Sequence, residues 1–334
     1  MLRKILDYLV FVLVRIVDAL IQMAGPDEAL FHARRIGRWW WALDRRHRTI
    51  ALTNLRNSFP DWSEGELHRV GRASFESLAS FAVDVMLTPR RITPTRWTQH
   101  IRLVNFTETL ELLLTPRQPV IMLTAHYGNF EIMGYVLATL GFATVSVARP
   151  IDNPYLNRFI LGVRQRHGQA ILYKKGATGS MAQVLVNHGV LCFIADQNAG
   201  HKGEFVDFFG RPASTYKSIS LLAIEHRCPI VVGYARRQGG GFRYDIGVQE
   251  VIHPADWADQ PDPLAWITRR FSRAMEAFIR VDSRQYWWIH RRWKSRPAGE
   301  RPGDRPAEAG AKYHPLTLRE PAAAGAGHLD ESQT

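Results

Sequence analysis

The sequence predicts an α/β protein with a largely parallel or mixed sheet flanked by helices, preceded by an α-helical membrane-associating region. Short apolar runs alternate with helical stretches from about residue 96 onward, which is typical of strands joined by crossover helices. The runs are apolar almost throughout, as expected of strands buried on both faces. We predict four segments: an amphipathic membrane-associating helix (1–24), a helical region (25–95), an α/β domain (96–297) and a disordered tail (298–334).

The first segment contains the most apolar stretch, Ile5 to Met23, which is interrupted by Asp7, Arg15 and Asp18. On a helix the polar residues fall within one sector of roughly 120°. The longest uncharged piece is far shorter than the roughly 20 residues of a spanning helix. We therefore expect a helix lying in the headgroup region, with docking on a neighbouring helix or a tilted span as alternatives. The internal charges disfavour a cleaved signal peptide, so we expect the chemistry on the cytoplasmic side.

The second segment shows starts and ends of helices. Pro26-Asp27-Glu28 begins one helix, Pro60 ends another, and Ser63-Glu64-Gly65-Glu66 begins a third. The Trp39-Trp40-Trp41 run lies among arginines. It fits either an interfacial belt or a helix that packs its tryptophans inward and leaves its arginines in water.

The third segment carries the strand signals. We expect a further strand at Phe242 to Val248 and a helix at Pro263 to Val281. After Pro297 the composition turns to Pro, Gly, Ala and scattered charge, which predicts disorder. The main strands are expected at Val120 to Leu123, Thr144 to Ala148, Val190 to Ala195 and Ile230 to Tyr234.

The charge of the chain points to an acidic partner. Forty-three Lys and Arg against 31 Asp and Glu give a net charge of +12, which suits nucleic acid, anionic lipid, a phosphorylated substrate or an acidic carrier protein. No zinc-finger, RNA-recognition or His-Glu-x-x-His pattern occurs, so a non-enzymatic nucleic-acid or membrane binder is only an alternative, and no metal is expected. Cys192 and Cys228 fit buried thiols.

Polar residues follow each predicted strand, at the edge where open α/β sheets bind ligands. This edge would collect a base, acids and guanidinium groups. The clusters are Thr124-Ala125-His126, Arg149-Pro150, Asp196-Gln197-Asn198 and Arg236-Arg237.

His126 and Glu131 form the first candidate pair. Five positions apart, they would lie about 140° apart on a straight helix and could not meet. If Gly128 and Asn129 make the turn into the following helix, the two side chains can face each other. A carboxylate on one ring nitrogen would then fix the tautomer and raise the basicity of the other nitrogen. The alternative is a polar pair without a catalytic role.

This cluster also carries a resemblance. His126-Tyr127-Gly128-Asn129-Phe130-Glu131 resembles the corresponding motif of the lipid A biosynthesis (lauroyl/myristoyl) acyltransferases, within the wider glycerolipid acyltransferase group. The glycerolipid enzymes commonly have Asp where Glu131 stands, whereas the lipid A branch accepts either acid. The resemblance covers about residues 1 to 297. Further matching motifs follow in order: Arg149-Pro150, Asn153-Pro154, Arg164, Asp196-Gln197, Phe208 to Pro212 and Gln285 to Lys294.

The resemblance implies transfer of a fatty acyl group from an acyl carrier protein thioester, or from coenzyme A, to a hydroxyl of a lipid-linked sugar. The acceptor would be a lipid A precursor at the cytoplasmic face of the cell inner membrane, with membrane phospholipid as a further partner, no nucleic acid and no cofactor. His126 would be the general base and Glu131 would orient it. Another glycolipid or a lysophospholipid, such as a phosphatidylinositol mannoside, is an alternative acceptor.

Other polar residues fit substrate binding or structure equally. Arg149 and Arg164 suit a phosphate or an oxyanion, although Arg149 could instead pair with Asp196 or Asp152. Asp196 and Gln197 would orient substrate or brace Arg149. Asn129 would contact substrate or simply cap its helix. The tryptophan-rich and arginine-rich stretch after Gln285 fits either an acidic carrier or a tryptophan core.

Overall fold

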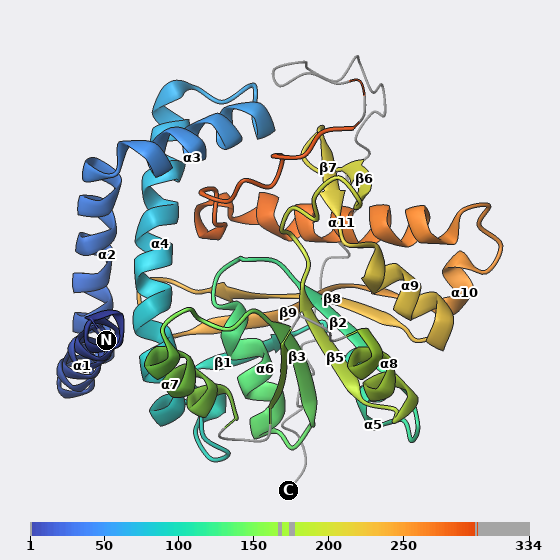
Figure 1. The fold of residues 1–334 in the computed structure, drawn as a ribbon, viewed down its shortest axis with the longest axis horizontal. Helices are drawn as coiled ribbons and strands as arrows, with labels where there is room; N and C mark the ends of the chain where they lie inside the picture. The colour runs from blue at the N-terminus through green and yellow to red at the C-terminus, as the bar shows by residue number, and fades with distance from the viewer. Residues whose placement is uncertain (1, 166–168, 174–177, 298, 300–334) are drawn as a thin grey trace, which may run out of the picture.

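The computed structural model describes residues 2–165, 169–173, 178–297 and 299 of the chain. The tail predicted for 298–334 therefore lies outside the described residues, apart from Gly299. The chain begins with four helices, which stand beside the sheet in Figure 1. They are α1 (Leu2–Met23), α2 (Pro26–Leu43), α3 (Arg45–Ser58) and α4 (Glu64–Arg91).

The predicted helix boundaries follow from local capping. Pro26 occupies the first turn of α2, where its missing N–H costs nothing. α3 ends at Ser58, before Pro60. Ser63 caps α4 by accepting from the backbone N–H of Glu66, whose side chain accepts in return from the Ser63 N–H. The helix starts and ends expected in this part of the sequence are thus observed.

A seven-stranded sheet follows, in the order β1-β9-β8-β2-β5-β3-β4. Neighbouring strands are parallel except for the antiparallel pair β8 and β9. The predicted α/β class with a largely parallel, helix-flanked sheet is confirmed. The strands are β1 (Ile101–Val104), β2 (Val120–Thr124), β3 (Thr144–Ala148), β4 (Ala170–Tyr173), β5 (Val190–Ile194), β8 (Ile230–Arg237) and β9 (Tyr244–Ile252). A separate hairpin pairs β6 (Glu204–Asp207) with β7 (Pro212–Thr215).

Helices cover both faces of the sheet (Figure 1). Alternate residues of β2 divide between two hydrophobic clusters: Ile121 and Leu123 belong to one, Val120 and Met122 to the other. The first cluster includes residues of α8, α9 and α11, and the second includes residues of α6. The remaining helices are α5 (Thr107–Leu114), α6 (Phe130–Thr139), α7 (Pro154–Gln165), α8 (Thr178–Val186), α9 (Lys217–His226), α10 (Pro254–Trp257) and α11 (Pro263–Val281).

Helix α1 docks on α4 and α7 through polar contacts and leaves apolar side chains outside. The Gln22 amide donates to the Met86 carbonyl at 2.7 Å, and the Asn153 amide donates to the Asp7 carbonyl at 2.8 Å. Its outer face exposes large apolar residues, including Leu9, Leu13 and Leu20. No helix among the described residues combines the length and apolar character needed to cross a membrane.

The last described stretch, after the short helix η2 (Ser283–Gln285), runs back into the core. The Asn54 amide of α3 donates to the carbonyls of Trp288 and His290 at 2.8 and 2.9 Å. Trp288 and Arg292 are fully buried, whereas Arg291 is exposed. Of the two alternatives left open for this stretch, a tryptophan core matches the structure at Trp288.

Candidate active site

The register of the sheet brings His126 and Asp196 together. β2 and β5 are parallel neighbours whose last residues, Thr124 and Ile194, lie side by side. The ladder continues one step further, where the Ala195 N–H donates to the Thr124 carbonyl at 2.9 Å. His126 and Asp196 each follow their strand by two residues, so they meet above the carboxyl edge of the sheet.

Asp196 holds His126 at two points. Its Oδ1 is 2.7 Å from His126 Nδ1, and its Oδ2 accepts the His126 backbone N–H at 3.0 Å. The carboxylate is almost fully buried. Burial alone would raise the pKa of Asp196, but the charge and hydrogen bonds of His126 outweigh it and hold that pKa well below its usual range. An ionised Asp196 keeps the proton on Nδ1, so that Nε2 carries the lone pair that can act as a base.

The loop that carries His126 is fixed on both sides. The Gly128 N–H donates to the Gln285 carbonyl at 3.0 Å, and the Trp287 N–H donates to the His126 carbonyl at 3.1 Å. Gly128 has a φ of +54°, and a Cβ there would lie 1.9 Å from the Ala235 carbonyl oxygen of β8. Only glycine fits this turn, because it needs both positive φ and close backbone approach.

Aromatic rings surround the His126 imidazole. Phe130 packs edge-on against it with ring centroids 5.0 Å apart, and Trp287 lies at the same distance. His290 is closer still, at 4.5 Å. Burial, followed by the nearby His126, lowers the pKa of His290 to about 4. His290 is therefore neutral at physiological pH and adds no charge beside the candidate base.

Glu131 does not hold His126, which corrects the pairing expected from the sequence. Its two carboxylate oxygens accept from Arg164 of α7, from Nη2 at 2.5 Å and from Nε at 2.9 Å. Glu131 lies in the first turn of α6 as expected, but the partner of the His126 Nδ1 is Asp196. The physical reason is the register of β2 and β5, which places Asp196 beside the imidazole of His126. Glu131 lies further along the chain, in α6.

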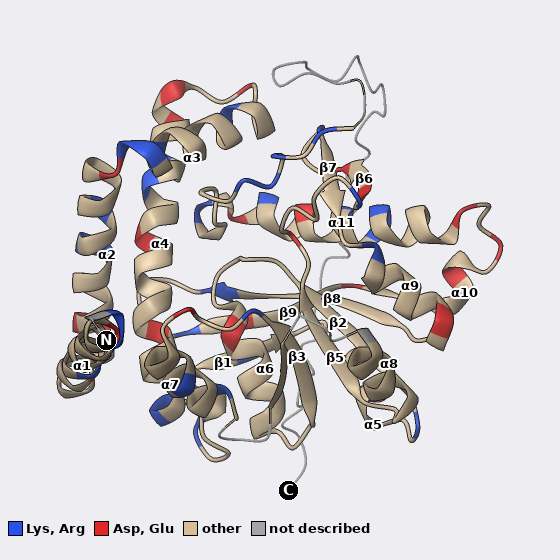
Figure 2. Ribbon diagram, viewed as in Figure 1, with Lys and Arg blue, Asp and Glu red and all other residues tan. Residues whose placement is uncertain are grey.

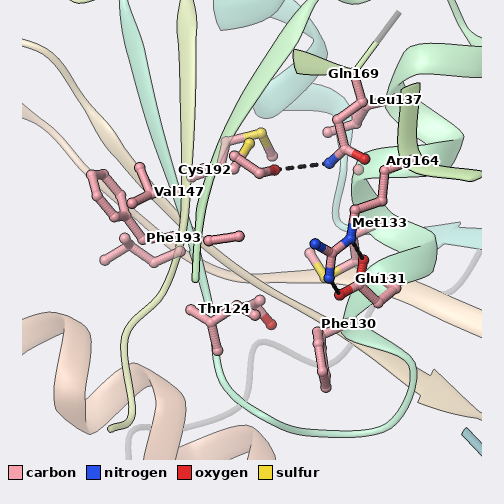
Figure 3. Close-up of a pocket in the computed structure, with 16 residues that line it drawn as sticks. Thr124, Phe130, Glu131, Met133, Leu137, Val147, Arg164, Gln169, Cys192 and Phe193 are labelled. Carbon is pink, nitrogen blue, oxygen red and sulfur yellow. Dashed lines mark hydrogen bonds and ion pairs between the residues drawn. The ribbon is translucent and has the colours of Figure 1, made fainter. Parts of the chain in front are cut away.

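A cavity opens beside Thr124 and Phe130, at the end of β2 that leads to His126 (Figure 3). It has a volume of about 610 Å³, counting the part open to solvent, and lies between β2, β3, β5 and helices α6 and α7. Thr124, Phe130 and the Glu131–Arg164 pair line one end, and the lining is otherwise mainly apolar, with Gln169 and Ser146 hydrogen-bonded to each other. Phe130 thus contacts both the cavity and His126.

Of the remaining expected site residues, Gln197 contacts His126, whereas Asn129 and Arg149 have other partners. Gln197 joins the site, because its Nε2 lies 3.4 Å from His126 Nε2. Asn129 caps α6 by accepting the Ile132 N–H at 3.2 Å. The Arg149 side chain is 84% exposed, and it pairs with the Asp152 carboxylate at 3.8 Å. Asp196 therefore braces His126 rather than Arg149.

Sequence reasoning missed two supports of the site. Tyr286 is fully buried near Asp196, and burial, followed by the charge of that carboxylate, raises the pKa of Tyr286 well above its usual value. Arg292 donates to the Gln197 carbonyl at 3.0 Å and to Thr215 Oγ1 at 2.6 Å. Both residues lie in the stretch 285–294 that the sequence had singled out, but their contacts depend on a chain path that spacing does not reveal.

The chain is similar to known proteins of one family. The sequence model of the family "Bacterial lipid A biosynthesis acyltransferase" matches residues 1–295. The lipid A biosynthesis lauroyltransferase of Escherichia coli is 26% identical over 263 residues, which is 76% of this chain and 81% of that protein. A lipid A biosynthesis acyltransferase of Haemophilus influenzae is 23% identical over 270 residues, covering 80% and 81% of the two chains.

Among solved structures, the chain resembles the 1-acyl-sn-glycerophosphate acyltransferase PlsC from Thermotoga maritima. The TM-score is 0.35 and the identity 10%, over 76% of this chain and 98% of that one. A similarity at this level supports no conclusion about function.

Proposed function

Because the chain belongs to the bacterial lipid A biosynthesis acyltransferase family, we propose that it moves a fatty acyl group onto a hydroxyl of a lipid A precursor. The donor in this proposal is an acyl carrier protein thioester, or else acyl-coenzyme A. The observation that carries it is the buried His126–Asp196 pair, whose imidazole packs against Phe130, a lining residue of an apolar cavity. An acyl chain fits the mainly apolar lining, and a base beside it suits attack on a thioester.

The proposed reaction proceeds by direct transfer. His126 Nε2 takes the proton of the acceptor hydroxyl while the oxygen attacks the thioester carbonyl, and Asp196 stabilises the imidazolium that forms. Collapse of the tetrahedral intermediate breaks the carbon–sulfur bond. The thiolate leaves with the proton from His126, so the enzyme returns to its starting state.

Arg164 stands in this proposal as the group that stabilises the oxyanion or a substrate phosphate. Its guanidinium lies at the end of the cavity nearest Thr124 and Phe130, and Glu131 fixes its orientation through two hydrogen bonds. Glu131 is thus a positioning residue for Arg164 rather than the partner of the general base.

The proposed location is the cytoplasmic face of the inner membrane, with α1 lying in the headgroup region. Two observations support this position: α1 turns Asp18 and Gln22 toward α4 and α7, and its exposed face carries Leu9, Leu13 and Leu20. A bilayer that covers these apolar side chains removes them from water, which favours binding of the helix at the membrane surface.

The test is an assay with the purified full-length chain, an acyl carrier protein thioester and a lipid A precursor, followed by mass spectrometry of the lipid. We expect the precursor to gain one acyl group. His126→Ala should abolish the gain, whereas His32→Ala, which alters an exposed histidine of α2, should leave it unchanged. Full turnover in His126→Ala would disprove the proposed chemistry. Acylation of another glycolipid or a lysophospholipid instead would replace the acceptor.

A further inference from the structure

A second cavity lies outside the proposed active site, between α1, α4 and α7. It measures about 1000 Å³ with its solvent-open part, and it receives one arginine from each of the three helices: Arg15, Arg90 and Arg158. Asp18 is the one acidic side chain among its lining residues. Figure 2 shows the corresponding basic colouring on α7 and at the lower end of α4, next to α1. We call this the arginine groove.

The charge of the groove is incompletely neutralised. Arg15 lies 3.9 Å from Asp18, and its guanidinium sits 5.1 Å from the centre of the Phe159 ring. Within the described part of the chain, neither Arg90 nor Arg158 has a carboxylate within salt-bridge distance. Three cations against one anion make the groove a site for a negatively charged group.

The place of the groove identifies the kind of anion. It is formed in part by the inward side of α1, and the outward side of the same helix exposes Leu13, Ile16 and Leu20. A helix with this exposed face buries it at the boundary between headgroups and acyl chains. The arginine groove on its opposite side then lies level with the phosphate layer.

We propose that the arginine groove binds the phosphate group of an anionic membrane phospholipid. This inference rests on the membrane position proposed above for α1. Arg90 and Arg158 supply planar guanidinium groups that suit the paired oxygens of a phosphate. The groove includes Val163, the residue before Arg164 on α7, so a bound lipid stabilises the helix that brings Arg164 to the active site.

The test compares two double variants with the same loss of charge. Arg90→Gln/Arg158→Gln removes cations from the groove, and Arg3→Gln/Lys4→Gln removes the same number from the exposed start of α1. Full-length protein in neutral detergent is titrated with short-chain phosphatidic acid, and bound lipid is counted by native mass spectrometry. A neutral micelle has no surface potential, so general attraction to an anionic surface does not contribute.

We expect the groove variant to bind phosphatidic acid up to roughly 30-fold more weakly, the upper range for the loss of two exposed guanidinium–phosphate ion pairs. The Arg3→Gln/Lys4→Gln control should stay within about twofold of the parent. Equal losses in the two variants would overturn the proposal. Thermal unfolding of each variant, together with the single changes Arg90→Gln and Arg158→Gln, separates loss of binding from loss of fold.

Two competition experiments identify the source of the phosphate. Inorganic phosphate should displace the lipid only weakly, and phosphatidylcholine should not compete with phosphatidic acid. Displacement by inorganic phosphate at matched concentration would reduce the groove to a free-ion site and refute the lipid proposal. Equal binding of phosphatidylcholine would refute the preference for an anionic lipid. Neither readout uses acyl transfer, so a failure of lipid binding in the arginine groove would not count against the proposed reaction. A failure of acyl transfer would likewise not count against lipid binding in the groove.

Discussion

Replacing Asp196 with asparagine reverses the hydrogen bond that sets the tautomer of His126. Asp196 now accepts from both the Nδ1–H and the backbone N–H of His126. An asparagine can still accept the backbone N–H through its one oxygen, but it then turns its NH₂ group toward Nδ1. The imidazole must place its proton on Nε2 to accept this bond, and the nitrogen facing the hydroxyl is no longer a base.

We expect Asp196→Asn to lower kcat by about 10⁴-fold, the loss typical when an amide reverses the tautomer of a catalytic histidine. This corresponds to roughly 5 kcal/mol in the barrier. Glu131→Gln should cost only about 10–100-fold, with a rise in KM, because it loosens Arg164 without changing the tautomer.

The assay measures initial rates of acyl transfer from an acyl carrier protein thioester, with the melting temperature of each variant recorded in parallel. Each substitution replaces one carboxylate by an amide of the same size, so Glu131→Gln is the matched control for Asp196→Asn. If Asp196→Asn kept its rate within tenfold of the parent, or if Glu131→Gln were the more damaging change, the assignment of Asp196 as the partner of His126 would be refuted.

Three further predictions concern stability. The pKa of His290 in the folded protein, about 4, lies below the usual value of 6.5, so the unfolded chain binds more protons between these two pH values. The free energy of unfolding should therefore fall by roughly 3 kcal/mol as the pH drops from about 6.5 to 4. Denaturant titrations should show a shallower fall in His290→Gln. Gly128→Ala should lower the melting temperature far more than Gly141→Ala, since both have positive φ but only Gly128 faces a backbone oxygen. Asp84→Ala should destabilise by about 3–5 kcal/mol by stranding the buried Arg237, and adding Arg237→Met should restore part of it; no restoration would contradict a buried pair.

The sequence was sufficient for most of the architecture because the signals are local. Pro26 and the Ser63 capping box mark helix starts in any context, and the continuous apolar runs mark buried strands. The edge strands β1 and β4 were missed, since Ile101–Val104 and Ala170–Tyr173 are only four residues long and only partly buried.

The candidate site was only partly predictable. Collecting polar residues at the strand ends correctly brought His126 and Asp196 to one edge, but the order of strands decides which residues are neighbours. No local sequence pattern indicates that β2 and β5 are neighbours in the sheet, because β3 and β4 lie between them in the sequence. Glu131 was assigned to His126 because it is close along the chain. The partner of Glu131, Arg164, comes from α7, which follows the next strand.

The stretch from Gln285 to Arg292 is the last part of the chain to join the surroundings of His126. The loop bearing His126 is hydrogen-bonded to Gln285 and Trp287, and the carbonyl that follows Asp196 is bound by Arg292. During synthesis, the ribosome has therefore produced nearly the whole α/β domain before these hydrogen bonds can form. A nascent chain stalled ahead of Gln285 therefore carries His126 without these hydrogen bonds.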